Sequence, residues 1–385
     1  MLANVHPDFA RERLSSHFVY ESYDEVSKLF FNRGSIGFVL KGWPLVGTNL
    51  QAQNEISEFL KSEDNLPAGS SFQVMMIGTN NVDLYLDRWA SFRQGEIFQT
   101  LAKRRIEFLK KQARLDGTIK DTFVLIAVTV PIKEVDELTI SEMERRKEIT
   151  ASMFASIGLH TSNVDGAELL RILRMFFGWS KYHSDLNPHE VIAEQILRGD
   201  FTAKVEKDRI LIQGDDLDEL PDQAIVALEA MRRPPSWNLA MMNLFLGNEM
   251  RRGEQIKSDF ILSFGLTMLP SQTLETSHAM AKRETLAKNL KSGLLKWLPN
   301  LEEEYKDMDA AVVALQEGER MVVINQTIIL KDDPLKIKER QYEYRSMMRR
   351  NGFEFVPCSN DHIAVLLASL PMQLVEKTRG TFRVL

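Results

Sequence analysis

The chain has 385 residues and a formal net charge of −6, and hydrophobic residues make up 44% of it and charged residues 26%. This composition is typical of a folded globular protein and excludes global disorder, while the length favours two or more lobes. The acidic balance argues against a dedicated nucleic-acid binder. The single cysteine, Cys358, excludes an internal disulfide and a multi-cysteine zinc site, and a buried structural thiol is the favoured interpretation.

The first residues lack the basic and apolar regions of a signal peptide. The longest apolar run, 123–132, contains Pro131 and is about half as long as a membrane-spanning helix. We therefore expect a cytoplasmic chain with no direct membrane span, whose contact with a membrane comes through a partner.

Hydrophobic periodicity and turn residues predict alternating strands and helices, whereas residues 1–33 have no clean period and are expected to form short helices. The expected strands are 35–40, 72–77, 123–130, the hairpin 201–206 and 209–213, 260–268, 320–330 and 353–356. The expected helices are 49–60, 91–114, 141–157, 166–177, 239–250, 271–298, 301–316, 332–350 and 362–370.

This order predicts a mixed α/β fold in which two lobes of mixed sheet are covered by amphipathic helices. The acidic stretch 214–222 is the best candidate boundary, which divides the chain into a first lobe, 1–213, and a second lobe, 214–385. The two lobes have a similar order of elements but no repeat in their sequences. The strand-to-helix turns are not glycine-rich, so a dinucleotide-binding fold is not indicated.

The residues contain no phosphate-binding loop, because G-x-x-x-x-G-K-[ST] occurs nowhere in the sequence. The glycines at 34–37 and 42–47 are better explained by turns. No G-x-S-x-G motif is present, and no spacing singles out a Ser-His-Asp triad. We therefore assign no catalytic, cofactor-binding or metal-binding residue.

Three weaker signals have a functional and a structural interpretation. His183, Asp185 and His189 form the closest metal-ligand cluster, but a solvated loop is favoured. Trp237 and the pairs Met241-Met242 and Met347-Met348 suit either an adaptable interface or, as we favour, a core. Basic stretches that could bind phosphates, but are better explained by surface ion pairs with neighbouring acids, are 103–105, 110–111, 145–147 and 349–350.

A string of short segments resembles the TraC family of F-type conjugative type IV secretion ATPases. The amino-terminal segments are Tyr20–Asp24, Leu29–Asn32, Ile36–Leu40, Pro44–Gly47 and the helix Asn54–Leu60. Further along, the segments are Pro235–Asn238, Ser258–Leu262, Arg349–Phe355 and Ser369–Pro371. The resemblance rests on the order of these segments and covers nearly the whole chain.

The resemblance implies an amino-terminal half whose parent continues into a RecA-like motor domain with Walker motifs. ATP and magnesium are then expected only in that motor domain, and the chain itself should not turn over ATP. The implied role is to dock the motor onto inner-membrane components of the secretion machine, in pilus assembly and DNA transfer, with peripheral membrane association through partners. Self-association is implied for the full-length protein.

Two alternatives from other classes stay open. One is a stand-alone enzyme with a cryptic metal site around His183, Asp185 and His189, and the other is a nucleic-acid-binding module that uses the basic helix surfaces. The second predicts an affinity that falls steeply with salt.

Overall fold

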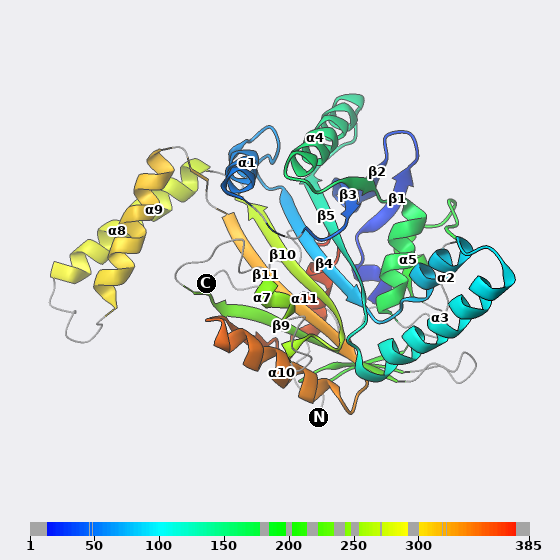
Figure 1. Cartoon of the computed structure of the whole chain (residues 1–385). Coiled ribbons are helices and arrows are strands. Elements are labelled where there is room, and N and C mark those ends of the chain that lie inside the picture. Colours follow the sequence, from blue (N-terminus) through cyan, green and yellow to red (C-terminus); the bar gives the residue numbers. More distant parts are fainter. Residues whose placement is uncertain are drawn as a thin grey trace.

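The computed structural model describes residues 14–45, 47, 49–177, 185–197, 202–213, 222–234, 243–247, 254–269, 272–291, 300–317, 319–320 and 322–374. The described residues form a 12-stranded sheet with helices on both faces, which confirms the mixed α/β class (Figure 1). Each strand pairing is antiparallel, so the sheet is more uniform than the mixed sheet that was expected.

The first half of the described chain contains six strands and the helices between them. Its strands are β1 (Tyr20–Asp24), β2 (Leu29–Asn32), β3 (Ser35–Gly42), β4 (Ser71–Thr79), β5 (Asp121–Pro131) and β6 (Thr161–Asn163). Its helices are the 3₁₀ helix η1 (Leu14–His17), α1 (Leu50–Lys61), α2 (Asp83–Ser91), α3 (Glu96–Asp116), α4 (Glu137–Ser156) and α5 (Gly166–Phe176).

The second half has a matching set of elements. Its strands are β7 (Ala203–Val205), β8 (Ile210–Ile212), β9 (Gln223–Arg232), β10 (Asp259–Met268), β11 (Val322–Asp332) and β12 (Glu354–Pro357). Its helices are α6 (Ile192–Ile196), α7 (Asn243–Leu246), α8 (Gln272–Lys291), α9 (Leu301–Gln316), α10 (Ile337–Arg350) and α11 (His362–Ala368).

The strand order has the same pattern when it is read from either end of the sheet. It is β1-β2-β3-β5-β4-β10-β11-β9-β8-β7, with β6 paired to β3 and β12 paired to β9. In the first half, the β1–β2 hairpin leads to β3, α1 connects β3 to β4, and β5 lies between β3 and β4. In the second half, the β7–β8 hairpin leads to β9, α7 lies between β9 and β10 in the chain, and β11 lies between β9 and β10 in the sheet. The halves meet where β4 and β10 pair antiparallel, from Ser71 opposite Thr267 to Gly78 opposite Phe260. The structure therefore contains one topology twice, related by an approximate two-fold axis at this seam.

Three hydrophobic clusters hold the layers together. One cluster runs across both halves on a single face of the sheet, where α5, α6 and α11 cover the strands. On the opposite face, α1 and α4 cover the first half and α7 and α10 cover the second half, as two separate clusters. Because the first cluster spans the seam, with Ile77 and Ile261 directly opposite each other, the two halves share a core.

Local sequence explains several helix ends. Asp136 and Asp165 cap α4 and α5, and each carboxylate accepts a hydrogen bond from a backbone amide of the first turn. Gly117 ends α3 with a φ of 65°, in the left-handed region that glycine adopts without strain. A Cβ at Gly117 would lie 2.1 Å from the carbonyl oxygen of Lys257, so this position also requires the absence of a side chain.

The structure corrects two expectations about secondary structure. The segment before residue 33 was expected to form short helices, but it contributes β1 and β2, which pair with each other and with β3. No element was expected over residues 223–232, which form β9; their alanine, leucine, glutamate and methionine favour helices and give no clear strand signal. The segment is a strand because β11 pairs along one side of it, and β8 and β12 pair along its other side.

The expected boundary between the lobes lies in a segment of which residues 214–221 are outside the described residues. Strands β7 and β8 precede that boundary and pair with each other, yet β8 also pairs with β9 beyond it. The division into 1–213 and 214–385 stays a prediction.

Each half carries a helical hairpin between its fourth and fifth strands. The α2–α3 hairpin connects β4 to β5, and the α8–α9 hairpin connects β10 to β11. Figure 1 shows α8 and α9 projecting from one side of the sheet and α2 and α3 lying at the other side. Since β4 and β5 pair directly, as do β10 and β11, the strand pairing of each half does not depend on hydrogen bonds from its hairpin.

Candidate functional site

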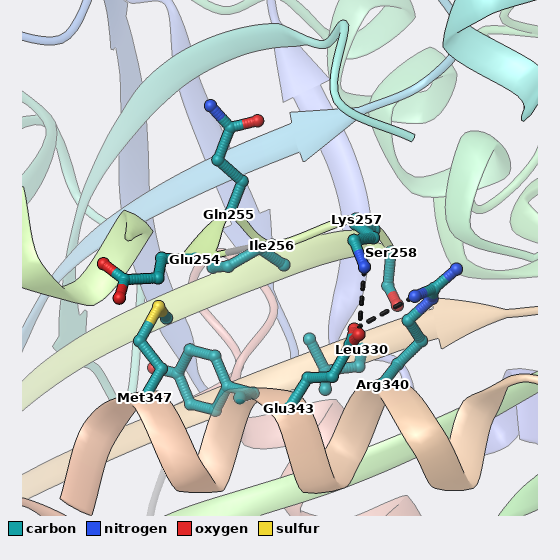
Figure 2. A pocket seen from close by; sticks show the side chains of 10 residues that line it. Glu254, Gln255, Ile256, Lys257, Ser258, Leu330, Arg340, Glu343 and Met347 are labelled. Atoms are coloured by element: carbon teal, nitrogen blue, oxygen red, sulfur yellow. Dashed lines mark hydrogen bonds and ion pairs between the residues drawn. The ribbon is translucent and has the colours of Figure 1, made fainter. Parts of the chain in front are cut away.

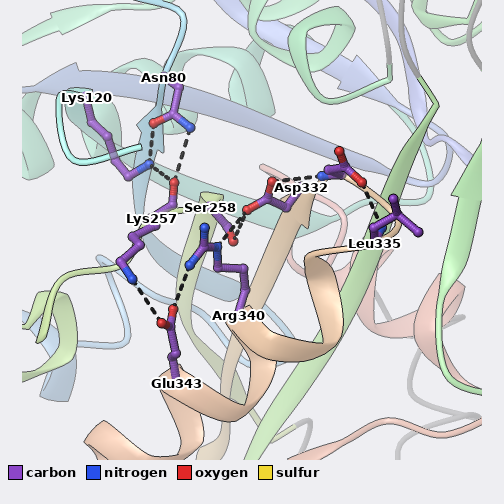
Figure 3. Close-up of polar contacts among 9 residues, drawn as sticks. Asn80, Lys120, Lys257, Ser258, Asp332, Leu335, Arg340 and Glu343 are labelled. Carbon is purple, nitrogen blue, oxygen red and sulfur yellow. Dashed lines mark hydrogen bonds and ion pairs between the residues drawn. The ribbon is translucent and has the colours of Figure 1, made fainter. Parts of the chain in front are cut away.

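Charged and amide side chains gather where β4 ends and β10 begins, at one edge of the seam between the halves (Figure 3). The Lys257 backbone carbonyl lies at the centre of this network. It accepts hydrogen bonds from Lys120 Nζ at 2.9 Å and from Asn80 Nδ2 at 3.2 Å. Lys120 also donates to Asn80 Oδ1 at 2.5 Å, and the backbone N–H of Asn80 donates to Asp259 Oδ1 at 2.6 Å. Residues of the first half thus hold the start of β10.

Helix α10 joins the network through Arg340 and Glu343. Arg340 lies 3.3 Å from Asp332 Oδ2 and 3.0 Å from Glu343 Oε2, and Lys257 Nζ lies 2.9 Å from Glu343 Oε1. Partial burial opposes ionisation of Glu343, but the hydrogen bonds from Lys257 and Arg340 outweigh it and hold the pKa of the carboxyl below its ordinary value. Glu343 is therefore a fixed anion, not a proton donor for catalysis.

Lys331, in β11, is paired with Asp259 at the start of β10. Burial lowers the pKa of Lys331, and the opposing charge of Asp259, 3.7 Å away, favours the ammonium form. The ammonium also donates to the Met175 carbonyl at 2.7 Å and lies 5.6 Å from the centre of the Phe176 ring. These contacts join β11 to the end of α5, so Lys331 connects the two halves and is not left free to act as a nucleophile.

The space beside this network is too small for a substrate. Figure 2 shows the cavity between α10 and the start of β10, and its volume is about 10 Å³. That is roughly the space of one water molecule, whereas small-molecule sites are usually at least about 300 Å³. The chemistry of the network is electrostatic and structural: it fastens α10 and the two halves at one point.

A wider hollow of about 330 Å³ lies at the start of α1 and is lined by Asn49, Glu55 and Ser156, among others. Asn49 already caps the helix by accepting a hydrogen bond from the Ala52 amide, and the Glu55 carboxylate is bound by Ser156. A carboxylate disfavours a phosphate group there, and none of the described residues that line the hollow is basic. This described lining lacks the groups that a nucleotide requires.

The residues singled out for metal binding are only partly within the described structure. Asp185 and His189 are exposed, and His183 lies outside the described residues, so the cluster stays a hypothesis. In the described part of the chain, no group of three or more His, Cys, Asp and Glu residues is placed to hold a metal ion.

Two of the interface candidates belong to the core. Met347 and Met348 lie on the buried side of α10, which confirms the favoured interpretation for this pair. Trp237, Met241 and Met242 lie outside the described residues. Cys358 is half-buried and packs against the core shared by both halves. Burial raises the pKa of its thiol, and so the reactive thiolate is disfavoured.

Three of the four basic stretches contain an ion pair, but only one of the pairs has the expected spacing of four residues within a helix. Arg146 pairs with Glu142 one turn away, Arg350 pairs with Glu254, and Lys110 bridges Asp83 and Asp87. Lys147 is buried and donates to the Ser27 carbonyl. Lys103, Arg104, Arg105 and Lys111 of α3, and Arg145 of α4, form no ion pair within the described part of the chain.

The fold and the site define a mixed α/β protein with one topology repeated and with no nucleotide pocket assembled among its described residues. No helix in the part of the chain that the structure describes is long and apolar enough to cross a membrane. The family model described as "TraC protein" matches residues 14–374, and the chain belongs to this family. This membership supports a place among conjugation-related type IV secretion proteins.

The chain is also similar to Protein TraC of Escherichia coli (strain K12). The two are 24% identical over 379 residues, which cover 91% of this chain and 42% of that protein. The chain therefore spans less than half the length of the curated relative that it matches.

Proposed function

We propose that the chain is the amino-terminal docking and assembly part of a conjugative type IV secretion ATPase, with no catalytic site of its own. The family match carries the proposal, because it extends over nearly the whole described fold. The absence of a phosphate-binding motif from the 385 residues supports a role other than nucleotide hydrolysis. ATP and magnesium belong to a motor domain outside this chain.

The proposed partners are inner-membrane components of the secretion machine, and the proposed location is the cytoplasmic face of the inner membrane. Each half exposes a helical hairpin outside the sheet, and these hairpins offer surfaces for partners without disturbing the core. The full-length protein is proposed to self-associate.

The experiment is affinity capture of tagged chain co-expressed with the inner-membrane proteins of its own secretion machine, after detergent solubilisation. We expect at least one of those proteins to be retained stoichiometrically, and the isolated chain to show no ATP hydrolysis above a buffer control. Failure to retain any of them, or hydrolysis that follows the chain through several columns, would contradict the proposal.

A DNA-binding measurement on the same chain distinguishes the docking function from the nucleic-acid-binding alternative. Affinity for duplex DNA that falls steeply between about 50 and 200 mM salt would favour that alternative. Binding that is absent or insensitive to salt would exclude it.

A further inference from the structure

The outer side of α3 carries large apolar side chains that contact no other part of the described structure extensively. Ile97, Leu101, Phe108 and Leu115 are between 58% and 75% exposed. Their spacing of four, seven and seven residues returns to one side of the helix over roughly 27 Å. We call these four residues the α3 stripe. The opposite side of α3 holds Ala102 and Ala113, which are buried, so the stripe is not needed for packing.

Basic side chains border the stripe on both sides. Arg104 and Lys111 lie one turn from Leu101, Phe108 and Leu115 along one side, and Arg105 lies along the other. All three are exposed, and none forms an ion pair with a described residue. The basic stretches 110–111, 145–147 and 349–350 each contain at least one residue in an ion pair, whereas no residue of 103–105 has one among the described residues.

The end of the hairpin extends the apolar surface. Phe92 and Phe98 are 68% and 63% exposed where α2 connects to α3. The Trp89 ring lies beside them in sequence, with the Arg93 guanidinium 4.4 Å from its centre. Aromatic and arginine side chains together suit the boundary between water and lipid, where one part of each group is apolar and another is polar.

We propose that the α3 stripe binds the surface of an anionic lipid bilayer, with α3 lying parallel to it. The helix has the chemistry of an interfacial helix: an apolar face of phenylalanine, leucine and isoleucine between arginine and lysine flanks. A planar anionic surface can contact the basic residues on both sides of the stripe at once. A single partner helix would place its acidic residues along only one of these sides. The stripe is the convex outer side of a helix, which fits a flat surface better than an inserted side chain.

This inference goes beyond the proposed docking function, in which proteins provide the membrane contact. The two are tested separately. Capture of an inner-membrane protein does not require lipid binding, and binding to protein-free vesicles does not require a protein partner.

The test is co-flotation of the full chain with vesicles of phosphatidylcholine alone and with vesicles that contain phosphatidylglycerol. We expect flotation only with the anionic vesicles and weaker flotation at high salt. Reversing the flanks with Arg104→Glu, Arg105→Glu and Lys111→Glu should reduce the bound fraction about tenfold or more. The matched control reverses three exposed lysines of the other hairpin, Lys282→Glu, Lys288→Glu and Lys291→Glu, and should bind like the unchanged chain.

A second pair of variants tests insertion of the apolar residues. Leu101→Gln with Phe108→Ser should also reduce binding about tenfold. Leu138→Gln with Leu335→Gln, at exposed leucines outside the hairpin, should not. All these positions are on the surface, and circular dichroism confirms that each variant folds.

Three results would overturn the proposal. One is no flotation with anionic vesicles, and a second is equal loss in the test and control variants. The third is evidence that the stripe binds protein. It would be seen as a dimer that becomes a monomer only after Phe108→Ser, or as hydrogen exchange in α3 that is slowed by an acidic protein but not by vesicles. Either form of the third result would assign the stripe to a protein interface.

Discussion

The two helical hairpins occupy equivalent places in the repeated topology but have opposite surfaces. Helix α3 carries six basic and three acidic side chains, and its outer side is apolar. Helix α9 carries five acidic side chains and one basic side chain. Its single exposed large hydrophobic residue is Val313, which is 44% exposed. An ion pair joins the two helices of each hairpin, Arg283 with Asp309 in α8–α9 and Lys110 with Asp83 in α2–α3. Helices α2 and α3 also meet around Val82, Leu86 and Ala113.

This difference separates what folding requires from what it leaves free. The strands of the two halves keep the same order and pairing, because both halves bury them on both faces. The hairpins leave the sheet, and their outer sides have no core to match, so their sequences can diverge without loss of stability. A charged or apolar pattern on those sides is therefore a better indicator of function than the same pattern in the sheet.

The largest expected effect concerns the shared core at the seam. Ile261→Ala should lower the free energy of unfolding by about 2–5 kcal/mol, because Ile261 is fully packed against the core of both halves. Urea unfolding with hydrogen exchange should show one transition in which β5 and β11 lose protection together. Two transitions, of which only one shifts, would mean that the halves are independent units. Leu335→Ala, at a residue that is 92% exposed, is the control and should change the stability by less than about 0.5 kcal/mol.

A second prediction compares the helices that cover the same face in each half. Arg340→Ala removes the cation between Asp332 and Glu343, and Lys147→Ala removes the donor to the Ser27 carbonyl. Each should cost about 1–3 kcal/mol in urea unfolding at pH 7.

Acid should then separate the two variants. The pKa of Glu343 is lower in the folded chain, so its stabilising effect is present above its ordinary pKa and is lost as the pH falls through the folded value. The loss caused by Arg340→Ala should therefore shrink below about pH 4, while that caused by Lys147→Ala depends less on carboxyl protonation. Equal pH dependence would contradict the assignment of Arg340 to carboxylates. Glu339→Ala, on the exposed side of α10, is the control.

A third prediction concerns His362, which begins α11 and is fully buried. Its Nδ1 accepts a hydrogen bond from the Ala227 amide at 3.1 Å, and burial lowers the pKa of the imidazole. The unfolded chain then binds the proton more tightly, so stability should fall as the pH drops below the ordinary histidine pKa toward the lower folded value. Urea midpoints between pH 7.5 and 5.5 should show this slope, and His362→Gln should flatten it. The exposed His160→Gln serves as control, and an unchanged slope in His362→Gln would assign the effect to other groups.

The smallest expected effect lies in the α8–α9 hairpin. Arg283→Ala removes a partly exposed ion pair with Asp309 and should cost less than about 1 kcal/mol. Hydrogen exchange should rise in α8 and α9 alone and leave β10 and β11 unchanged. A spread of the effect into the sheet would show that the hairpin and the repeat are coupled.

Sequence patterns predicted the elements whose own residues determine their structure. Helix α9 was expected at its observed bounds, Leu301–Gln316, and β4, β5, β10 and β11 each lie within two residues of the expected strands. Local signals account for these successes, since α9 ends before Gly318 and the strands are continuous apolar runs. The resemblance to the TraC family was likewise carried by the sequence and confirmed by the family match.

The elements that were missed depend on partners far away in the chain. β1 and β2 are short, and β9 is rich in helix-forming residues, so their backbone hydrogen bonds with other strands decide their conformation. The α3 helix was expected with its apolar and basic residues, but its orientation was not. A period of apolar residues does not show which of two apolar sides faces the core.

Without the structure, the residues already indicated the composition class, the absence of a phosphate-binding motif, most helices and long strands, and the family. Tertiary structure decided the repeated topology, because strand order depends on pairings between residues more than 150 positions apart, such as Ile77 with Ile261. It also decided that Ala102 and Ala113 are buried and that the α3 stripe is exposed. Both decisions follow from packing, which selects one side of a helix only when the neighbouring elements are in place.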